Sequence, residues 1–482
     1  MSVSMSLDTK TATSSRYTSA TKEQRNKTHN VDLLYLTRKD NAHYCCIRSL
    51  NKLLWRTKCK DRANKFCRNC LQGFTSQKVL DKHLTFCSKH EAQHLMFPSE
   101  GYGDIVEFEN FTKQMRIPFI IYCDFEAFGR KLDTCFPEPS RSNATMTVNY
   151  EACGYGHQVV SSDPRYTKPP VIYRGPEVAK HLLKNLFQEE EYIRKILDNI
   201  EPLKMTQKDE INFQNAPNCT ICGDIFSNTS GKVGDHCHVS GKFRGAACSA
   251  CNLNFQQPAF IPVFFHNLRG FDSHLLMKGI CLFKNKRINV IPNNMEKYIS
   301  VSFGSLRFID SFQFLPTSLA GLVEDLVNEN PSNFKLMEKE YQDEDKRSLL
   351  LRKGVYPYTW MDKETKFDVL SLPPKEAFYD DLAKNHISNE DYDHAKLVWN
   401  TFDIRSMGQY HDLYLKSNVL QLGCVVKRFR DECMFNYGLD PAHFYTSLGL
   451  AWSAALKVSK CRLQLITDPD MYLFVEAGMR GG

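Results

Sequence analysis

Apolar residues occur mainly in short runs that have the length of a buried strand. The two most apolar runs, Ile117–Cys123 and Pro258–Phe265, are each followed directly by acidic, imidazole or amide side chains. A continuous apolar run of about four to eight residues predicts a strand that is buried on both faces of a sheet. No run approaches the roughly 18–20 residues that cross a bilayer, so we expect no membrane partner.

A second pattern predicts helices. The residues that follow Asp272 form a helical run, and the stretch 407–437 reads as one long helix that Gly438 would end in the left-handed conformation. Tyr414 and Asn418 are four positions apart on this helix and therefore face the same side. Buried strands and helices of this kind together predict an α/β fold.

Two carboxylates interrupt the first apolar strand, in IPFIIYCDFEAF. The two-residue period of a strand places Asp124 and Glu126 on one face. Like charges held together at a strand end are unfavourable unless a cation neutralises them, so the pair indicates a metal-dependent phosphoryl-transfer site. The alternative is a chance pair of surface acids.

The first cysteine-rich stretch, FCRNCLQGFTSQKVLDKHLTFC, has the spacing of a small zinc finger. Cys67 and Cys70 form a C-x2-C knuckle, while His83 and Cys87 share one helix face because they are four residues apart. These four ligands predict a C2HC zinc finger over 67–87. Exposed residues near the start of its helix would serve to read DNA, and a structural or docking role is the alternative.

The second stretch contains two C-x2-C knuckles with GDHCHVSGKFRG between them. The knuckles predict a closed zinc site made by Cys219, Cys222, Cys248 and Cys251. The Asp, the two His and Asn252 then remain free for other chemistry. Asp and Asn oxygens suit Mg²⁺, and a neutral His can deprotonate water. A zinc ribbon with incidental polar residues is the alternative.

The pattern C-x2-C…DHCH…G-K-x-R-G…C-x2-C-N resembles the endonuclease VII group of His-Me finger nucleases. The resemblance implies structural zinc at the four cysteines, Mg²⁺ or Mn²⁺ at Asp235 and Asn252, and general-base catalysis by His236. His238 matches a second active-site histidine that assists at the phosphate. Every one of these positions is present in the sequence.

Three motifs in the order D-x-E, N-x3-F-D and Y-x3-N resemble the 3′–5′ exonuclease domain of protein-primed family B DNA polymerases of virus-like mobile elements. This resemblance extends from about residue 30 to the last residue of the sequence. It implies a ribonuclease H-like exonuclease fold, with Mg²⁺ or Mn²⁺ at Asp124, Glu126 and Asp272. Tyr414 would orient the attacking water.

The same resemblance implies DNA-contact residues, and the sequence differs from the family pattern at one metal-binding position. Asn267 and Ser311 would contact a single-stranded 3′ end, and a terminal protein that primes synthesis would be a partner. Asn418 stands where the family has a further metal-binding carboxylate. A neutral amide binds Mg²⁺ far more weakly, so we expect an impaired exonuclease. The palm carboxylates of a polymerase do not follow, so we expect no polymerase activity from this sequence.

The resemblances imply an order of domains along the chain. The predicted domains are a disordered tail (1–29), a basic module with the zinc finger (30–100), the first part of an α/β domain (115–212), an inserted zinc-bound ββα-type module (213–256), the second part of the α/β domain (257–435) and the start of a polymerase region (439–482).

Charge and cysteine content indicate the class of binding partner and the cellular compartment. Residues 1–100 hold 18 Lys and Arg against 8 Asp and Glu, whereas the whole chain has a net charge of +7. This basic part suits a polyanion such as DNA. The chain has 18 Cys and no secretory signal, which indicates reduced thiols and an intracellular address, the nucleus if the host is eukaryotic.

Three functions are compatible with these patterns. The first is the DNA-binding amino-terminal part of a family B DNA polymerase, acting in DNA replication with an impaired exonuclease. The second is a magnesium-dependent, structure-selective DNA endonuclease centred on His236. The third is a non-catalytic DNA-binding protein held together by zinc, so the sequence leaves open whether the chain is an enzyme.

Overall fold

The computed structural model describes residues 2–4, 14–18, 32–38, 41–58, 65–90, 96–131, 148–227, 231–280, 283, 286–293, 297–380 and 384–479. The chain divides into two compact units. One contains residues 1–107 and 461–482, and the other contains residues 108–460. Within the described ranges, no helix has both the length and the apolar character needed to cross a membrane.

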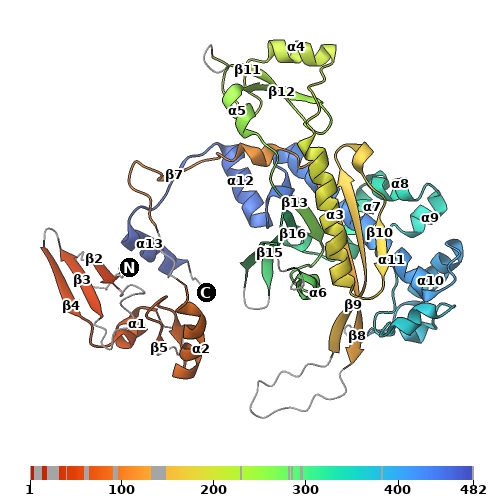
Figure 1. Ribbon diagram of the computed structural model, residues 1–482, viewed down its shortest axis with the longest axis horizontal. Coiled ribbons are helices and arrows are strands. Elements are labelled where there is room, and N and C mark those ends of the chain that lie inside the picture. The colour runs from red at the N-terminus through yellow and green to blue at the C-terminus, as the bar shows by residue number, and fades with distance from the viewer. Residues whose placement is uncertain are drawn as a thin grey trace. The chain divides into compact units, whose positions relative to one another are not determined.

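The first unit contains a four-stranded antiparallel sheet of order β1-β2-β3-β4 and a finger formed by β5, β6 and α2 (Figure 1). The tail prediction is wrong for β1 and β2, because their backbones pair within this sheet; the rest of 1–29 lies outside the described residues. The elements are β1 (Ser2–Ser4), β2 (Ser14–Thr18), β3 (Leu33–Arg38), β4 (Asn41–Cys46), α1 (Leu50–Lys58), β5 (Lys65–Phe66), β6 (Gly73–Phe74), α2 (Gln77–Cys87), β7 (Ile105–Val106), β17 (Leu463–Gln464) and α13 (Pro469–Gly478).

The second unit is a mixed α/β structure on a seven-stranded sheet of order β10-β9-β8-β13-β16-β15-β14. Its three central strands, β8, β13 and β16, are parallel, and the outer pairs are antiparallel. The two apolar runs form β8 and β13, buried strands as predicted, and the structure pairs them in parallel. The strands are β8 (Phe119–Lys131), β9 (Val148–Ser161), β10 (Val171–Arg174), β13 (Ile261–Phe265), β14 (Ile288–Pro292), β15 (Tyr298–Phe303) and β16 (Leu306–Asp310).

Helices and a small hairpin complete this unit. The long helix α11 starts after Ser406, whose side chain accepts the N–H of Gln409, and ends at Gly438 with φ 58°, as the pattern predicts. The elements are α3 (Val178–Asp198), α4 (Gln207–Asn215), β11 (Lys232–His236), β12 (Phe243–Cys248), α5 (Ser249–Asn254), α6 (Asp272–Ile280), α7 (Leu319–Glu329), α8 (Lys335–Glu340), α9 (Glu344–Leu349), α10 (Asn389–Thr401), α11 (Met407–Tyr437) and α12 (Ser447–Ser459).

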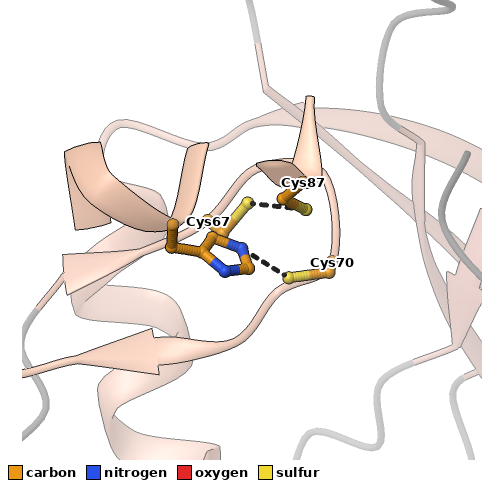
Figure 2. Close-up of side chains that lie close together, drawn as sticks. Cys67, Cys70 and Cys87 are labelled. Atoms are coloured by element: carbon orange, nitrogen blue, oxygen red, sulfur yellow. Dashed lines mark hydrogen bonds between the residues drawn. The ribbon is translucent and has the colours of Figure 1, made fainter. Parts of the chain in front are cut away.

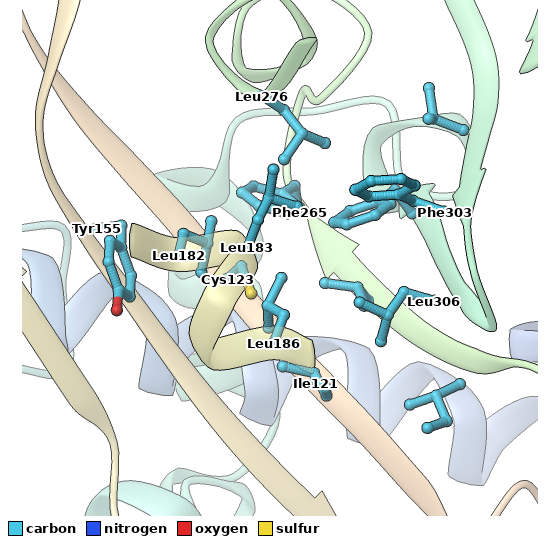
Figure 3. Close-up of a cluster of buried hydrophobic side chains, with 14 of the residues drawn as sticks. Ile121, Cys123, Tyr155, Leu182, Leu183, Leu186, Phe265, Leu276, Phe303 and Leu306 are labelled. Atoms are coloured by element: carbon cyan, nitrogen blue, oxygen red, sulfur yellow. The ribbon is translucent and has the colours of Figure 1, made fainter. Parts of the chain in front are cut away.

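One face of the central sheet is covered by α3 and α6. Ile121 and Cys123 of β8 pack there against Leu182 and Leu186 of α3, and Figure 3 shows these side chains directed at one another. The neighbouring strand β13 contributes Phe265 to the same cluster. Burial of large apolar side chains from strands and helices forms the main core of the unit.

The opposite face of β8 is covered by α11. Ile120 and Tyr122 alternate with the residues of the first face and pack against Val419 of α11. Because side chains along a strand alternate between faces, Asp124 and Glu126 continue on this α11 face. The alternation that places the two acids on one face of β8 therefore also places them next to α11.

Residues 439–460, which follow α11, belong to the same unit, whereas the sequence predicts a domain boundary at 439. Leu439 and Phe444 are buried in the cluster that contains Ile120. Asp440 is fully buried, and its carboxylate accepts hydrogen bonds from Arg430 Nε at 2.8 Å and from the backbone N–H of Ile117 at 2.9 Å. Apolar burial and this ion pair join the segment to the sheet.

We expect Asp440→Asn to lower the free energy of unfolding by about 3–5 kcal/mol, because it leaves the buried guanidinium of Arg430 without its counter-charge. Urea unfolding measures this change. Asp431→Asn is the matched control, since Asp431 pairs with partly exposed Lys427 and Arg116, and its expected cost is below about 1 kcal/mol. Equal losses in the two variants would contradict a special role for the buried pair.

Candidate metal centres

Two groups of side chains bring four potential ligands within 4.8 Å of one another in the described residues. They are Cys67, Cys70, His83 and Cys87, and Cys219, Cys222, Cys248 and Cys251. Thiolate and imidazole ligands in fours suit tetrahedral Zn²⁺. Both predicted zinc sets are therefore assembled and could hold zinc.

The first group lies between the β5–β6 knuckle and helix α2. Cys70 Sγ is 3.3 Å from His83 Nε2, and Figure 2 shows the sulfur atoms of Cys67, Cys70 and Cys87 converging. The buried side chain of Asn69 donates a hydrogen bond from Nδ2 to Cys87 Sγ at 3.1 Å. Sequence reasoning missed this supporting residue, because an Asn inside a knuckle carries no spacing signal.

The second group is preorganised by the backbone around Cys219. The N–H groups of Ile221 and Cys248 each point at Cys219 Sγ from 3.4 Å. Burial alone would raise the pKa of Cys219, but backbone hydrogen bonds outweigh it and lower the pKa to about 7. A sulfur that already accepts N–H bonds is suited to the thiolate form that zinc requires.

Zinc removal is expected to unfold the module around this group while the seven-stranded sheet persists. Its core, centred on Ile221, Ala247 and Phe255, is too small to fold alone, so ligand binding supplies its folding free energy. After chelation, hydrogen exchange should lose protection in β11 and β12 but keep it in β8 and β13. Cys251→Ser should act in the same way, with exposed Cys46→Ser as control. Unchanged protection of β11 and β12 would refute this dependence.

The residues between the two knuckles form a hairpin followed by a short helix. Asp235 and His236 end β11, Asp235 lies opposite Gly245 of β12, and the register shifts between Asp235 and His236. Helix α5 follows directly and carries Asn252. Figure 1 shows β11, β12 and α5 grouped together with α4. The predicted ββα order is therefore present.

Two histidines stand beside each other at the end of this hairpin. The ring centroids of His236 and His238 are 5.1 Å apart. In the described structure His236 Nε2 is buried and has no hydrogen-bond partner. Burial lowers the pKa of His238, and the nearby His236 and Arg244 lower it further. The imidazole nitrogen of His236 without a hydrogen-bond partner could accept a proton, which is the chemistry of a general base.

Asp235 is held by an ion pair that sequence reasoning missed. Arg244, on the neighbouring strand, donates from Nε to Asp235 Oδ2 at 2.6 Å and from Nη2 to Oδ1 at 2.7 Å. The Asp235 side chain is only 5% exposed. Asn252 is half-buried on α5. As oxygen donors, Asp235 and Asn252 fit Mg²⁺ or Mn²⁺, which would bind and polarise a phosphate when present.

A second candidate centre lies between the sheet and α11. Asp124 is adjacent to the end of β13, because Tyr122 pairs with Phe264, and Asp272 begins α6 shortly after β13. Burial raises the pKa of Asp272 well above its usual value, and the charges of Asp124 and Glu126 raise it further. The structure therefore brings together the three predicted acids from distant parts of the chain.

Burial and mutual repulsion raise the pKa values of these acids. Burial raises the pKa of Asp124 to about 6, although a hydrogen bond from Asn418 lowers it. Burial and the charge of Asp124 both raise the pKa of Glu126. Within the described residues, the acids are not among the groups whose ligand atoms all lie within 4.8 Å, as expected of carboxylates that repel one another.

Asn418, on helix α11, lies next to the acids of this second centre. Its Nδ2 donates to Asp124 Oδ2 at 3.1 Å, while its Oδ1 is buried without a hydrogen-bond partner in the described structure. Asp412, two positions before Tyr414, instead binds Arg174 at 2.6 Å. The Asp412 carboxylate is therefore engaged by Arg174 and not by the three acids.

Tyr414 and a lysine complete the surroundings of the acids. The buried ring of Tyr414 stacks on Tyr356 with centroids 4.8 Å apart, and its hydroxyl is hydrogen-bonded to that of Tyr358. The positive charge of Lys353 opposes the effect of burial on the pKa of Asp124. Sequence reasoning missed Lys353, since it lies in a segment without periodicity and next to no recognisable motif.

The predicted DNA-contact residues lie at the ends of two parallel strands, β13 and β16. Asn267 has a left-handed backbone with φ 67°, and its N–H donates to buried Asp310 at 2.9 Å. Ser311 Oγ is 2.9 Å from Nδ1 of His266. Both residues therefore border the same sheet edge as the acids, and their contact with DNA stays a prediction.

The hairpin β11–β12 with its paired histidines and the helix α5 thus form a small module that contains the second four-cysteine group. Residues 195–261 match the family model of recombination endonuclease VII. The matched segment runs from the end of α3 to the first residue of β13, so this endonuclease VII-like domain is inserted between strands of the large sheet. It includes the predicted module at 213–256 and extends beyond it on both sides. No curated protein matches the chain.

Proposed function

We propose that this chain is a DNA-binding nuclease whose cutting centre is the endonuclease VII-like site. The observation that carries the proposal is the placement of Asp235 and His236 at the end of a hairpin that the four-cysteine group anchors, within a segment that matches recombination endonuclease VII. DNA is the substrate that such a domain implies.

In the proposed reaction, His236 accepts a proton from water at its free Nε2 as the water oxygen attacks the phosphorus. The phosphorus–oxygen bond on the opposite side breaks, and the leaving oxygen takes a proton from solvent. Asp235 and Asn252 would hold Mg²⁺ or Mn²⁺, which would stabilise the charge on the phosphate. His238, whose pKa is lowered by burial, assists at the phosphate as a neutral hydrogen-bonding group.

A second function concerns the α/β unit. We propose that it is a ribonuclease H-like, 3′–5′ exonuclease-type domain from the family B polymerase lineage, spanning 115–212 and 257–435 as predicted. The convergence of Asp124 and Asp272 on the α11 face supports this proposal. Asn418 would impair it. Three further predictions depend on the sequence motifs and composition alone. They are a terminal protein as partner, the start of a polymerase region at 439–482 and a nuclear location.

Incubation of the zinc-loaded chain with end-labelled branched DNA tests the first proposal. We expect cuts near the branch with Mg²⁺ or Mn²⁺, and none after addition of EDTA. Linear duplex of the same sequence is the control for structure selectivity. Salt-dependent binding without cleavage under any divalent cation would instead identify a non-catalytic DNA-binding protein.

A further inference from the structure

The ion pair between Arg244 and Asp235 determines the charge of the endonuclease VII-like site. Both oxygens of the Asp235 carboxylate accept a hydrogen bond from the guanidinium, at 2.6 and 2.7 Å. The Asp235 side chain is 5% exposed, whereas that of Arg244 is 27% exposed. The Asp235 carboxylate is thus buried, and the Arg244 side chain is partly exposed.

The remaining donors add no negative charge. Asn252 is a neutral amide, and burial lowers the pKa of His238, which favours its neutral form. A dication would therefore meet one carboxylate whose charge Arg244 already balances. Divalent cations bind where negative charge is concentrated, so this donor set alone is a weak site. The second centre differs, since three carboxyl groups, those of Asp124, Glu126 and Asp272, lie near one another there.

We propose that the divalent cation binds this site together with a DNA phosphate, and that Arg244 moves its hydrogen bonds from Asp235 to that phosphate. The inference rests on the proposed endonuclease function and adds an order of binding to it. A phosphate offers the negative charge that the site lacks and two oxygens that match the fork of a guanidinium. Once released, Asp235 is free to bind the metal.

The surroundings of Arg244 suit such an exchange. Its guanidinium lies 5.1 Å from the ring centroid of Phe255, which offers an aromatic surface for the plane of the charge. Phe255 directly follows α5 and packs in the small core beside the cysteine group. Arg244 therefore has a support that persists when its hydrogen bonds to Asp235 are broken.

Mn²⁺ binding measured by electron paramagnetic resonance tests the inference independently of cleavage. The protein is the zinc-loaded full chain carrying His236→Ala, so that branched DNA stays intact. Without DNA, Asp235→Asn should leave the number of bound Mn²⁺ ions unchanged, because this site is not occupied. With DNA, Asp235→Asn should remove one ion, whose dissociation constant we expect to be about 10- to 100-fold tighter than without DNA. Loss of an ion on Asp235→Asn in the absence of DNA would overturn the inference.

Two substitutions of Arg244 test the role of its charge. Arg244→Gln should create one DNA-independent Mn²⁺ site, which additional Asp235→Asn should remove. Arg244→Lys keeps the charge and should create none. If Arg244→Gln fails to fold, the Mn²⁺ count of Asp235→Asn with and without DNA still tests the inference. If the unmodified chain cuts no DNA but the DNA-dependent ion is found, the endonuclease proposal fails while the binding order stands.

Discussion

His236→Ala is expected to lower metal-dependent cleavage of branched DNA by about 10²- to 10⁴-fold, the usual contribution of a general base. The reason is geometric. His236 follows Asp235 on the hairpin, and its Nε2 has no hydrogen-bond partner in the described structure, so this nitrogen is not committed to another group. Loss of the ring removes the proton acceptor without touching the zinc ligands. Single-turnover cleavage with excess protein measures the chemical step.

The control for this prediction is His386→Ala. His386 is exposed, its ring packs only against Tyr379 among the described aromatic side chains, and it belongs to neither metal centre. Zinc content and DNA affinity should stay unchanged in both variants. His238→Ala should reduce cleavage less than His236→Ala, because His238 assists rather than accepts the first proton. Cleavage that is unaffected by His236→Ala would remove His236 from the proposed mechanism.

Asn418→Asp is expected to raise degradation of single-stranded 3′ ends on the order of 10²- to 10³-fold, the range for restoring one electrostatic group at a reacting phosphate. Asn418 Nδ2 lies 3.1 Å from Asp124 Oδ2, so a carboxylate at this position would face the same cation as Asp124. The gain should appear only with Mg²⁺ or Mn²⁺ and should diminish below about pH 6, where Asp124, whose pKa burial raises to about 6, is protonated.

Stability gives an independent measurement on the same variant. Without a divalent cation, the new charge repels Asp124, so the melting temperature of Asn418→Asp should fall below that of the unmodified chain. Addition of Mg²⁺ should reverse this loss. Asn436→Asp is the matched control, because it adds the same charge to an exposed position of the same helix. If the unmodified chain already degrades 3′ ends as fast as Asn418→Asp, then Asn418 is not the defect.

Several features were predictable because they depend on residues close together in sequence. The spacing of Cys219 and Cys222, like that of His83 and Cys87, places ligands on one knuckle or one helix face, and both groups are assembled. The end of α11 at Gly438 follows from a backbone conformation that glycine favours. Local geometry determines such features, whatever the rest of the chain does.

Other features could not be predicted in this way. The boundary expected at 439 is absent, because Asp440 binds Arg430 and Ile117 inside the unit. The tail expected at 1–29 contains strands, because β2 finds a partner in β3. In each case a partner decided the outcome, and hydrophobic periodicity does not identify partners.

By itself, the sequence determined the metal-ligand sets, the buried strands and the shared face of Asp124 and Glu126, since spacing along a strand, a helix or a knuckle is sufficient for these. Only the tertiary structure decided that Asn418 is hydrogen-bonded to Asp124 and that Arg244 neutralises Asp235. The physical reason is that electrostatic coupling and hydrogen bonding depend on distance in space, which parallel strand pairing and helix packing set for residues far apart in the chain.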